Sequence, residues 1–279
     1  MSLLPILNVR SATEASAVLL AGFLVARQIP HRVAAFVSAA CFEIALVCGL
    51  FALWQVANRI TRGHTTGGLE RGRWVWHAER VMHFPSEVSV QRLILGHPDV
   101  VRVVNYYYDT AHLSFMVIFL IWLWLRHRDR YPYWRNTVAF FTLMSLLIQM
   151  VAVAPPRLIG NTGLVDTAAL YGQSVYAVVG DIADQYAAMP SIHVGWAVLI
   201  SIAVVTSSTS QWRWLFALHG PLTIFVVVAT ANHYWLDAVV ALVLLAIAMV
   251  MSRGVEQVKA RYSPSEEALP AQIQQSAFS

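Results

Sequence analysis

Long apolar segments separated by short polar ones dominate the hydrophobic pattern of this 279-residue chain. An α-helix needs about 20 predominantly apolar residues to cross a membrane. The segments that approach this requirement are residues 33–57, 105–125, 136–154, 192–208, 212–231 and 234–251. We therefore predict an all-α, polytopic membrane bundle with six transmembrane helices.

The two ends of the chain follow a different pattern. An N-terminal apolar segment, residues 12–26, is shorter and is interrupted by Glu14, so it either spans the membrane or lies in the interface, and we favour the interface. Residues 263–279 are polar and lack hydrophobic periodicity, which is typical of a disordered tail. We expect residues 1–262 to form one membrane-embedded domain.

Composition supports a membrane protein and excludes a nucleic-acid partner. Hydrophobic residues make up 58% of the chain and charged residues only 12%, whereas a typical globular chain is about a quarter charged. The formal charge of +4 comes from basic residues in short patches between apolar segments, as in membrane loops. The expected partner is the lipid bilayer.

Basic residues also predict the orientation, because they accumulate in cytoplasmic loops. The densest short cluster contains Arg126, Arg128, Arg130 and Arg135. Placing it in the cytoplasm puts the C-terminal tail there too, and puts residues 58–104, residues 155–191 and the turn at His233 outside. Trp74 and Trp76 make part of 58–104 an amphipathic stretch at the headgroup level. We expect an integral plasma-membrane protein whose polar residues of interest share the outer face.

The string Pro190-Ser191-Ile192-His193 opens one of the apolar segments. Proline and serine before an apolar run predict a helix start with Ser191 near the N-cap. A helix N-terminus suits a phosphate, Ser191 adds a hydroxyl donor, and His193 can give or take a proton. The alternative is a capping serine beside an interfacial histidine.

His233 and Asp237, in the string Asn232-His233-Tyr234-Trp235-Leu236-Asp237, lie four residues apart and so share one helical face. A carboxylate in an apolar helix is costly unless it is paired. Asp237 could hold one imidazole nitrogen of His233 while the other nitrogen acts as a nucleophile. The alternative is a structural His–Asp pair near a helix end.

Arg157 follows two prolines that end the segment 136–154. Its planar, permanently charged guanidinium group suits phosphate oxygens. A snorkelling arginine at a helix end is the equally weighted alternative.

Together these strings resemble the type-2 phosphatidic acid phosphatase superfamily of membrane phosphatases and phosphotransferases. Pro190-Ser191-Ile192-His193 is similar to its second signature, usually Pro-Ser-Gly-His, and His233 and Asp237 match the third. The resemblance covers roughly residues 150–251. It implies that His233 attacks phosphorus to form a phosphohistidine, Asp237 orients it, His193 protonates the leaving alcohol and Ser191 binds phosphate. The implied substrate is a phospholipid or polyprenyl phosphate, with water, an alcohol or a polyol as acceptor and no cofactor.

The chain departs from the family pattern where phosphate would be neutralised. Val226 and Val227 replace a serine–arginine pair, and the first signature is reduced to Arg157, with Gln149 a span-length earlier. The branch containing inositol phosphorylceramide and sphingomyelin synthases tolerates such losses and also has the His233-Tyr234 pair, so we expect the chain to resemble that branch most. Arginines of the outer loop could compensate: Arg71, Arg73, Arg80 and Arg92.

Further candidates and two other functions remain open. Asn232, Tyr234 and Asp181 are candidate pocket residues. His193, His233 and Asp237 could instead hold a divalent metal in a membrane hydrolase, although we expect no metal. A non-catalytic lipid transporter would find its best support in Glu43, which lies inside the first apolar segment.

Overall fold

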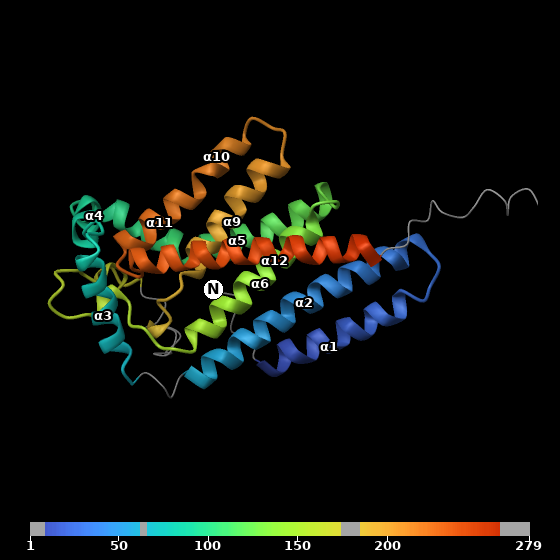
Figure 1. Ribbon diagram of the computed structural model, residues 1–279, viewed down its shortest axis with the longest axis horizontal. Helices are drawn as coiled ribbons and strands as arrows, with labels where there is room; N and C mark the ends of the chain where they lie inside the picture. The colour runs from blue at the N-terminus through green and yellow to red at the C-terminus, as the bar shows by residue number, and fades with distance from the viewer. Residues whose placement is uncertain (1–8, 62–65, 174–184, 263–279) are drawn as a thin grey trace, which may run out of the picture.

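The computed structural model describes residues 9–61, 66–173 and 185–262. Regular structure in these ranges is helical, apart from one isolated parallel bridge between Val153 and Ala187. Figure 1 shows the long helices α1, α2 and α12 running along the molecule, with α3 and α4 gathered at one end. The elements are α1 (Val9–Ala26), α2 (Arg32–Thr61), α3 (Gly68–Val81), α4 (Glu87–Leu95), α5 (Pro98–Arg126), α6 (Tyr131–Gln149), η2 (Pro156–Leu158), α7 (Thr167–Leu170), α9 (Ile192–Ser207), α10 (Arg213–Ala217), α11 (His219–Ala229) and α12 (Trp235–Tyr262).

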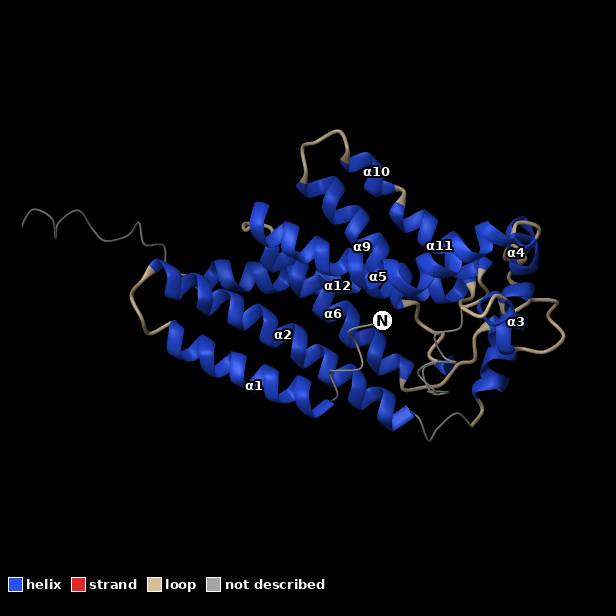
Figure 2. Cartoon of the chain, turned by 180° about the vertical axis from the view of Figure 1, so that it is seen from behind, coloured by secondary structure: helices blue, strands red, loops and turns tan. Residues whose placement is uncertain are grey.

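Helices α1 and α2 form a hairpin, visible from both sides in Figures 1 and 2. The hydroxyl of Ser16 in α1 donates a hydrogen bond of 2.9 Å to the carbonyl of Ala45 in α2. α1 is itself long and apolar enough to cross a membrane. Its packing along α2 therefore favours the spanning alternative for residues 12–26 over the interfacial one that we preferred.

The fold is an all-helical membrane bundle, but the prediction of six clear crossings is not confirmed. Among the described residues, four helices are long and apolar enough to span: Val9–Ala26, Arg32–Val56, Pro98–Arg126 and Trp235–Tyr262. The segment 192–208 gives α9, which has only 16 residues. The segment 212–231 is divided at Leu218 into α10 and α11. α6 has 19 residues but carries Arg135 and Asn136 in its first two turns.

The main core lies where α6, α9, α11 and α12 meet, and Phe141, Leu199 and Val227 are fully buried there. Gly195 permits the close approach of α9 to α6, because a Cβ atom at this position would lie 1.9 Å from the ring of Phe141. Small residues at a helix contact allow membrane helices to approach each other closely. The first turn of α9, which carries His193, is therefore fixed against α6.

The predicted outer loop 58–104 is largely helical, since it contains α3, α4 and the start of α5. Arg71 of α3 donates a hydrogen bond of 2.5 Å to the carbonyl of Ala152, and the amide of Ala154 donates one of 3.0 Å to Gly68. Trp74 is exposed on α3, whereas Trp76 is half-buried. These bonds attach α3 to the chain that follows α6.

Glu43, the residue that would support a transporter, is paired with a neighbouring helix. Its carboxylate accepts a hydrogen bond of 2.9 Å from the hydroxyl of Tyr131 and forms an ion pair with Arg135, both on α6. A buried carboxylate in an apolar helix needs such a partner. The pairing explains Glu43 as a contact between α2 and α6.

Candidate functional site

The turn between α11 and α12 presents His233. Ala231 adopts a left-handed conformation with φ of +54°, which is uncommon for a residue with a Cβ atom. The amides of Asn232 and His233 both donate to the carbonyl of Val227, at 3.1 and 3.2 Å. This tight turn places the imidazole just before the first turn of α12.

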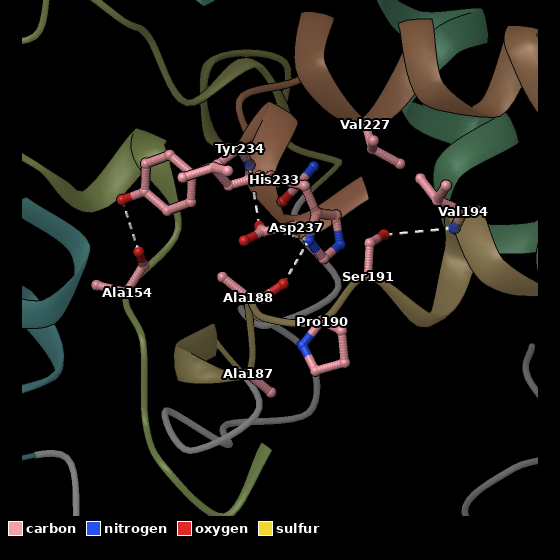
Figure 3. Close-up of polar contacts among 12 residues, drawn as sticks. Ala154, Ala187, Ala188, Pro190, Ser191, Val194, Val227, His233, Tyr234 and Asp237 are labelled. Carbon is pink, nitrogen blue, oxygen red and sulfur yellow. Dashed lines mark hydrogen bonds and ion pairs between the residues drawn. The ribbon is translucent and has the colours of Figure 1, made fainter. Parts of the chain in front are cut away.

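The hydrogen bonds of His233 determine which ring nitrogen is free to react. Nδ1 lies 2.7 Å from the carbonyl oxygen of Ala188 and 3.2 Å from Oδ2 of Asp237 (Figure 3). Both partners are acceptors, so Nδ1 carries the proton and donates it. Nε2 consequently has the lone pair, which is the arrangement that a nucleophilic imidazole requires. The contact expected between His233 and Asp237 is present, and the nearer partner is the backbone.

Asp237 is fully buried and makes two polar contacts at the start of α12. Besides contacting His233, Oδ2 accepts a hydrogen bond of 2.9 Å from the amide of Tyr234. In a capping box, the side chain of the third helical residue accepts a hydrogen bond from the amide of the residue just before the helix. Asp237 is the third residue of α12 and Tyr234 precedes the helix, so this bond is half of a capping box. Asp237 therefore holds the helix end and the imidazole together.

Ser191 and His193 come from the start of α9. Ser191 is the N-cap, as predicted, and its hydroxyl oxygen accepts a hydrogen bond of 3.3 Å from the amide of Val194. The Ser191 amide donates to the backbone carbonyl of Asp237 at 3.3 Å, which joins the starts of α9 and α12. The ring centroids of His193 and His233 are 5.6 Å apart. Two imidazoles from separate helices thus face one small region.

Arg157, on η2, braces the turn that carries His233. Its side chain is buried; Nη1 donates to the side-chain oxygen of Asn232, and Nε lies 3.2 Å from Asp166. Its amide donates to the carbonyl of Ala231 at 3.0 Å. The structure thus brings Arg157 and Asn232 next to His233.

Tyr234, another predicted pocket residue, does not join this group. The side chain of Tyr234 extends away from His233, and its hydroxyl donates to the carbonyl of Ala154 at 2.9 Å (Figure 3). This fully buried tyrosine holds the start of α12 against the chain after α6. Asp181 lies outside the described residues.

Two of the four outer-loop arginines, Arg71 and Arg80, make structural contacts around α3 and α4. Arg71 donates to the backbone carbonyls of Ala152 and Thr66, and Arg80 forms an ion pair of 2.7 Å with Glu87. Arg73 and Arg92 are exposed. The expectation that these four residues compensate a phosphate charge stays a prediction.

Two site residues from α5 were missed by the sequence reasoning. Tyr108 stacks on His193 with ring centroids 4.4 Å apart, and the ring of His112 lies 4.1 Å from that of His193. The available signal was their four-residue spacing on one face of an apolar segment, next to Asp109 and Asn105. Polar residues in such a segment face the bundle interior or a cavity.

Glu79 and Glu87 form a buried carboxyl pair near the start of α12. Glu79 of α3 accepts a hydrogen bond of 2.7 Å from the amide of Leu236, in the first turn of α12. Burial and a hydrogen bond shared with Glu87 raise the pKa of Glu79 to about 9. Glu79 is therefore protonated at neutral pH, and α3 contacts the helix end that carries Asp237.

Metal ligation was the alternative use of His193, His233 and Asp237. In the part of the chain that the structure describes, no group of three or more His, Cys, Asp or Glu side chains is arranged to hold a metal ion. Nδ1 of His233 is instead directed at Ala188 and Asp237.

Comparison with known proteins identifies the family. A family model of the PAP2 superfamily matches residues 73–251, which is well over half of the chain and extends from α3 into α12. The match includes both histidines and Asp237. No curated protein and no solved structure matches the chain. The chain therefore belongs to the PAP2 superfamily of phosphatase-type membrane enzymes.

Proposed function

We propose that this protein is an integral membrane lipid phosphatase or phosphotransferase that works through a phosphohistidine on His233. One observation carries the proposal. The rings of His193 and His233 are 5.6 Å apart, and the hydrogen bonds of His233 leave the lone pair on Nε2. A nucleophile and an acid–base group at this separation can act on one phosphoryl group from opposite sides.

The reaction has two half-reactions. First, Nε2 of His233 bonds to phosphorus, the bond from phosphorus to the ester oxygen breaks, and protonated His193 gives its proton to the leaving alcohol. Then water or an alcohol attacks phosphorus, His193 takes its proton, and the bond from phosphorus to Nε2 breaks. Asp237 and the carbonyl of Ala188 hold Nδ1–H throughout, and Asp237 stabilises the ring as it becomes positive.

Phosphate binding is assigned to Ser191 and Arg157. The oxygen of Ser191 accepts from Val194, so its proton remains to be donated to a phosphate oxygen. The amides at the start of α9 add to this positive end. Arg157 supplies the charge from beside Asn232.

The proposal also includes the membrane topology and the branch of the superfamily that the chain resembles. We infer that α1 crosses the membrane in addition to the six predicted segments, with the site on the outer face of the plasma membrane and the C-terminus in the cytoplasm, as the basic patches indicate. The His233-Tyr234 pair and the valines at 226 and 227 favour a likeness to the inositol phosphorylceramide and sphingomyelin synthase branch. A transferase of that kind would use a lipid phosphate and an alcohol or polyol acceptor.

The test uses purified protein in detergent micelles with phosphatidic acid, a phosphodiester phospholipid and a polyprenyl phosphate. We expect phosphate release, or a new phosphate ester, from at least one of them. With ³²P-labelled phosphatidic acid, an alkaline quench should trap label on the wild type and none on His233→Ala. His193→Ala should lose turnover, whereas His97→Ala, at an exposed histidine, should not. Turnover without trapped label would contradict the mechanism.

A further inference from the structure

The two histidines of the site are held in different ways. His233 is oriented by hydrogen bonds from Nδ1 to Ala188 and Asp237. In the part of the chain that the structure describes, the ring of His193 has no hydrogen-bond partner and contacts other rings instead. The orientation of the acid–base histidine therefore depends on the rings around it.

Tyr108 of α5 covers one face of the His193 imidazole. The ring centroids are 4.4 Å apart and the ring planes differ by only 17°, which is a stacked arrangement. Stacked aromatic rings attract each other beyond the area that they bury. The imidazole cannot turn about its bond to Cβ without losing this contact or striking the phenol ring. The stack therefore fixes the plane of His193.

His112 restricts the same ring from a second direction. Its centroid lies 4.1 Å from that of His193, with the ring planes tilted by 56°. His112 follows Tyr108 by four residues and so lies on the same face of α5. Its Nδ1 is 3.2 Å from the carbonyl oxygen of Tyr108, which attaches the His112 ring to the backbone of its own helix. One face of α5 thus presents two rings to His193.

Tyr108 is also close to the nucleophile. The ring centroid of Tyr108 is 6.4 Å from that of His233, and the centroids of His193 and His233 are 5.6 Å apart. The ring nitrogens of an imidazole lie in its plane and exchange protons along that plane. By fixing the plane of His193 beside His233, Tyr108 fixes the direction in which His193 gives or takes a proton.

A stacked face suits a residue with the role proposed for His193. In that reaction His193 gives a proton in the first half-reaction and takes one in the second. A hydrogen-bond acceptor at one ring nitrogen keeps a proton on that nitrogen, as Ala188 does for His233. Contact with the ring face occupies neither nitrogen, so the same contact persists in both protonation states.

We propose that Tyr108 is a positioning residue, whose phenol ring holds the plane of His193 for proton transfer to the leaving alcohol and from the incoming acceptor. The inference rests on the function proposed above. Tyr108 acts through His193, by means of its ring and not its hydroxyl group.

The variants separate the ring from the hydroxyl group. Tyr108→Leu removes the flat face, whereas Tyr108→Phe keeps it. Tyr106→Leu is the matched control, because Tyr106 lies on the same helix and is 66% exposed. Thermal unfolding is measured on the same preparations, and Tyr108→Met, which also lacks a flat face, takes the place of Tyr108→Leu if the latter does not fold.

The assay compares two leaving groups. Phosphatidic acid releases an alkoxide that needs a proton from His193, whereas 4-nitrophenyl phosphate releases a weakly basic phenolate that can leave without one. The readout is kcat/KM, which reports the steps up to cleavage of the ester bond. A residue that acts through His193 should affect the first substrate much more than the second.

We expect Tyr108→Leu to lower kcat/KM for phosphatidic acid about tenfold, the scale of one lost aromatic pair, and to change the value for 4-nitrophenyl phosphate little. Tyr108→Phe and Tyr106→Leu should match the wild type. Adding Tyr108→Leu to His193→Ala should cause no further loss on 4-nitrophenyl phosphate, because the two residues act as one unit.

Three results would overturn the positioning role. They are equal losses on the two substrates, a loss in Tyr108→Phe as large as that in Tyr108→Leu, and unchanged kcat/KM for phosphatidic acid in Tyr108→Leu. If the wild type cleaves phosphatidic acid alone, the comparison of Tyr108→Phe with Tyr108→Leu decides. Full turnover of phosphatidic acid by His193→Ala, or no cleavage of any phosphate ester by the wild type, would instead contradict the proposed function.

Discussion

The exchange Asp237→Asn removes one charge from the site and leaves its hydrogen bonds in place. Oδ2 accepts from both Nδ1 of His233 and the amide of Tyr234, while Oδ1 has no partner among the described residues. An asparagine can put its oxygen at the Oδ2 position and its amide group at the Oδ1 position. The cap on α12 and the direction of the imidazole should therefore survive.

The expected loss of kcat depends on which hydrogen bonds of His233 remain in Asp237→Asn. In serine-protease triads, the same exchange costs about 10⁴-fold in kcat because the histidine takes the wrong tautomer. Here the carbonyl of Ala188, at 2.7 Å, keeps the proton on Nδ1 without Asp237. Only the charge on one hydrogen bond is lost, which is worth about 1.5–3 kcal/mol. We expect kcat to fall by roughly 10- to 100-fold, since about 1.4 kcal/mol corresponds to tenfold.

The assay is steady-state turnover of the best lipid phosphate in mixed micelles, with thermal unfolding measured on the same preparations. Asp99→Asn is the matched control, because the Asp99 side chain is 94% exposed and should tolerate the change. A loss above about 10³-fold at unchanged unfolding temperature would show that Ala188 does not fix the tautomer. A loss below threefold would show that the Asp237 charge does not assist the reaction.

Three further outcomes are expected. The pKa of Glu79 is raised to about 9 from its usual value near 4.5, so the native state holds the extra proton between these pH values and stability should fall as pH rises through this window. Glu79→Gln should flatten the fall of the unfolding temperature with pH, whereas Glu70→Gln, at an exposed residue, should not. Equal pH curves for wild type and Glu79→Gln would refute the assignment. Gly195→Ala should destabilise the fold by about 1–3 kcal/mol through its clash with Phe141, whereas Gly254→Ala, with no atom within 4 Å, should not; recovery of the unfolding temperature in Gly195→Ala combined with Phe141→Leu tests the cause. Turnover should persist after prolonged treatment with a strong chelator, and loss that zinc or magnesium restores would favour the metal-dependent alternative.

Local features of the site could be read from the sequence because they depend on neighbours in the chain. Proline and serine before an apolar run predicted the start of α9, and Ser191 caps it. The four-residue spacing of His233 and Asp237 predicted their contact. The all-helical membrane bundle followed from apolar length.

Other features depend on packing between distant segments. No local pattern indicates that Ala188 supplies the nearest partner of His233, or that Tyr108 stacks on His193. The break between α10 and α11 at Leu218 did have a local signal, because His219, Gly220 and Pro221 follow it directly and Pro221 has no amide to donate to the carbonyl of Ala217. The apolar length of the segment concealed that signal. Hydropathy counts apolar residues and does not distinguish one spanning helix from two short ones.

The valines at 226 and 227 give a physical meaning to the departure from the family pattern. Both line the pocket beside His193, at positions where the resemblance leads one to expect serine and arginine. A guanidinium group there would draw anionic oxygens toward His193, whereas valines keep that wall neutral. The buried arginine that remains, Arg157, is bound to Asn232, the neighbour of His233. The positive charge proposed for phosphate binding therefore comes from η2, beside the turn that carries His233, and not from α11, where valines replace the serine and arginine that the resemblance leads one to expect.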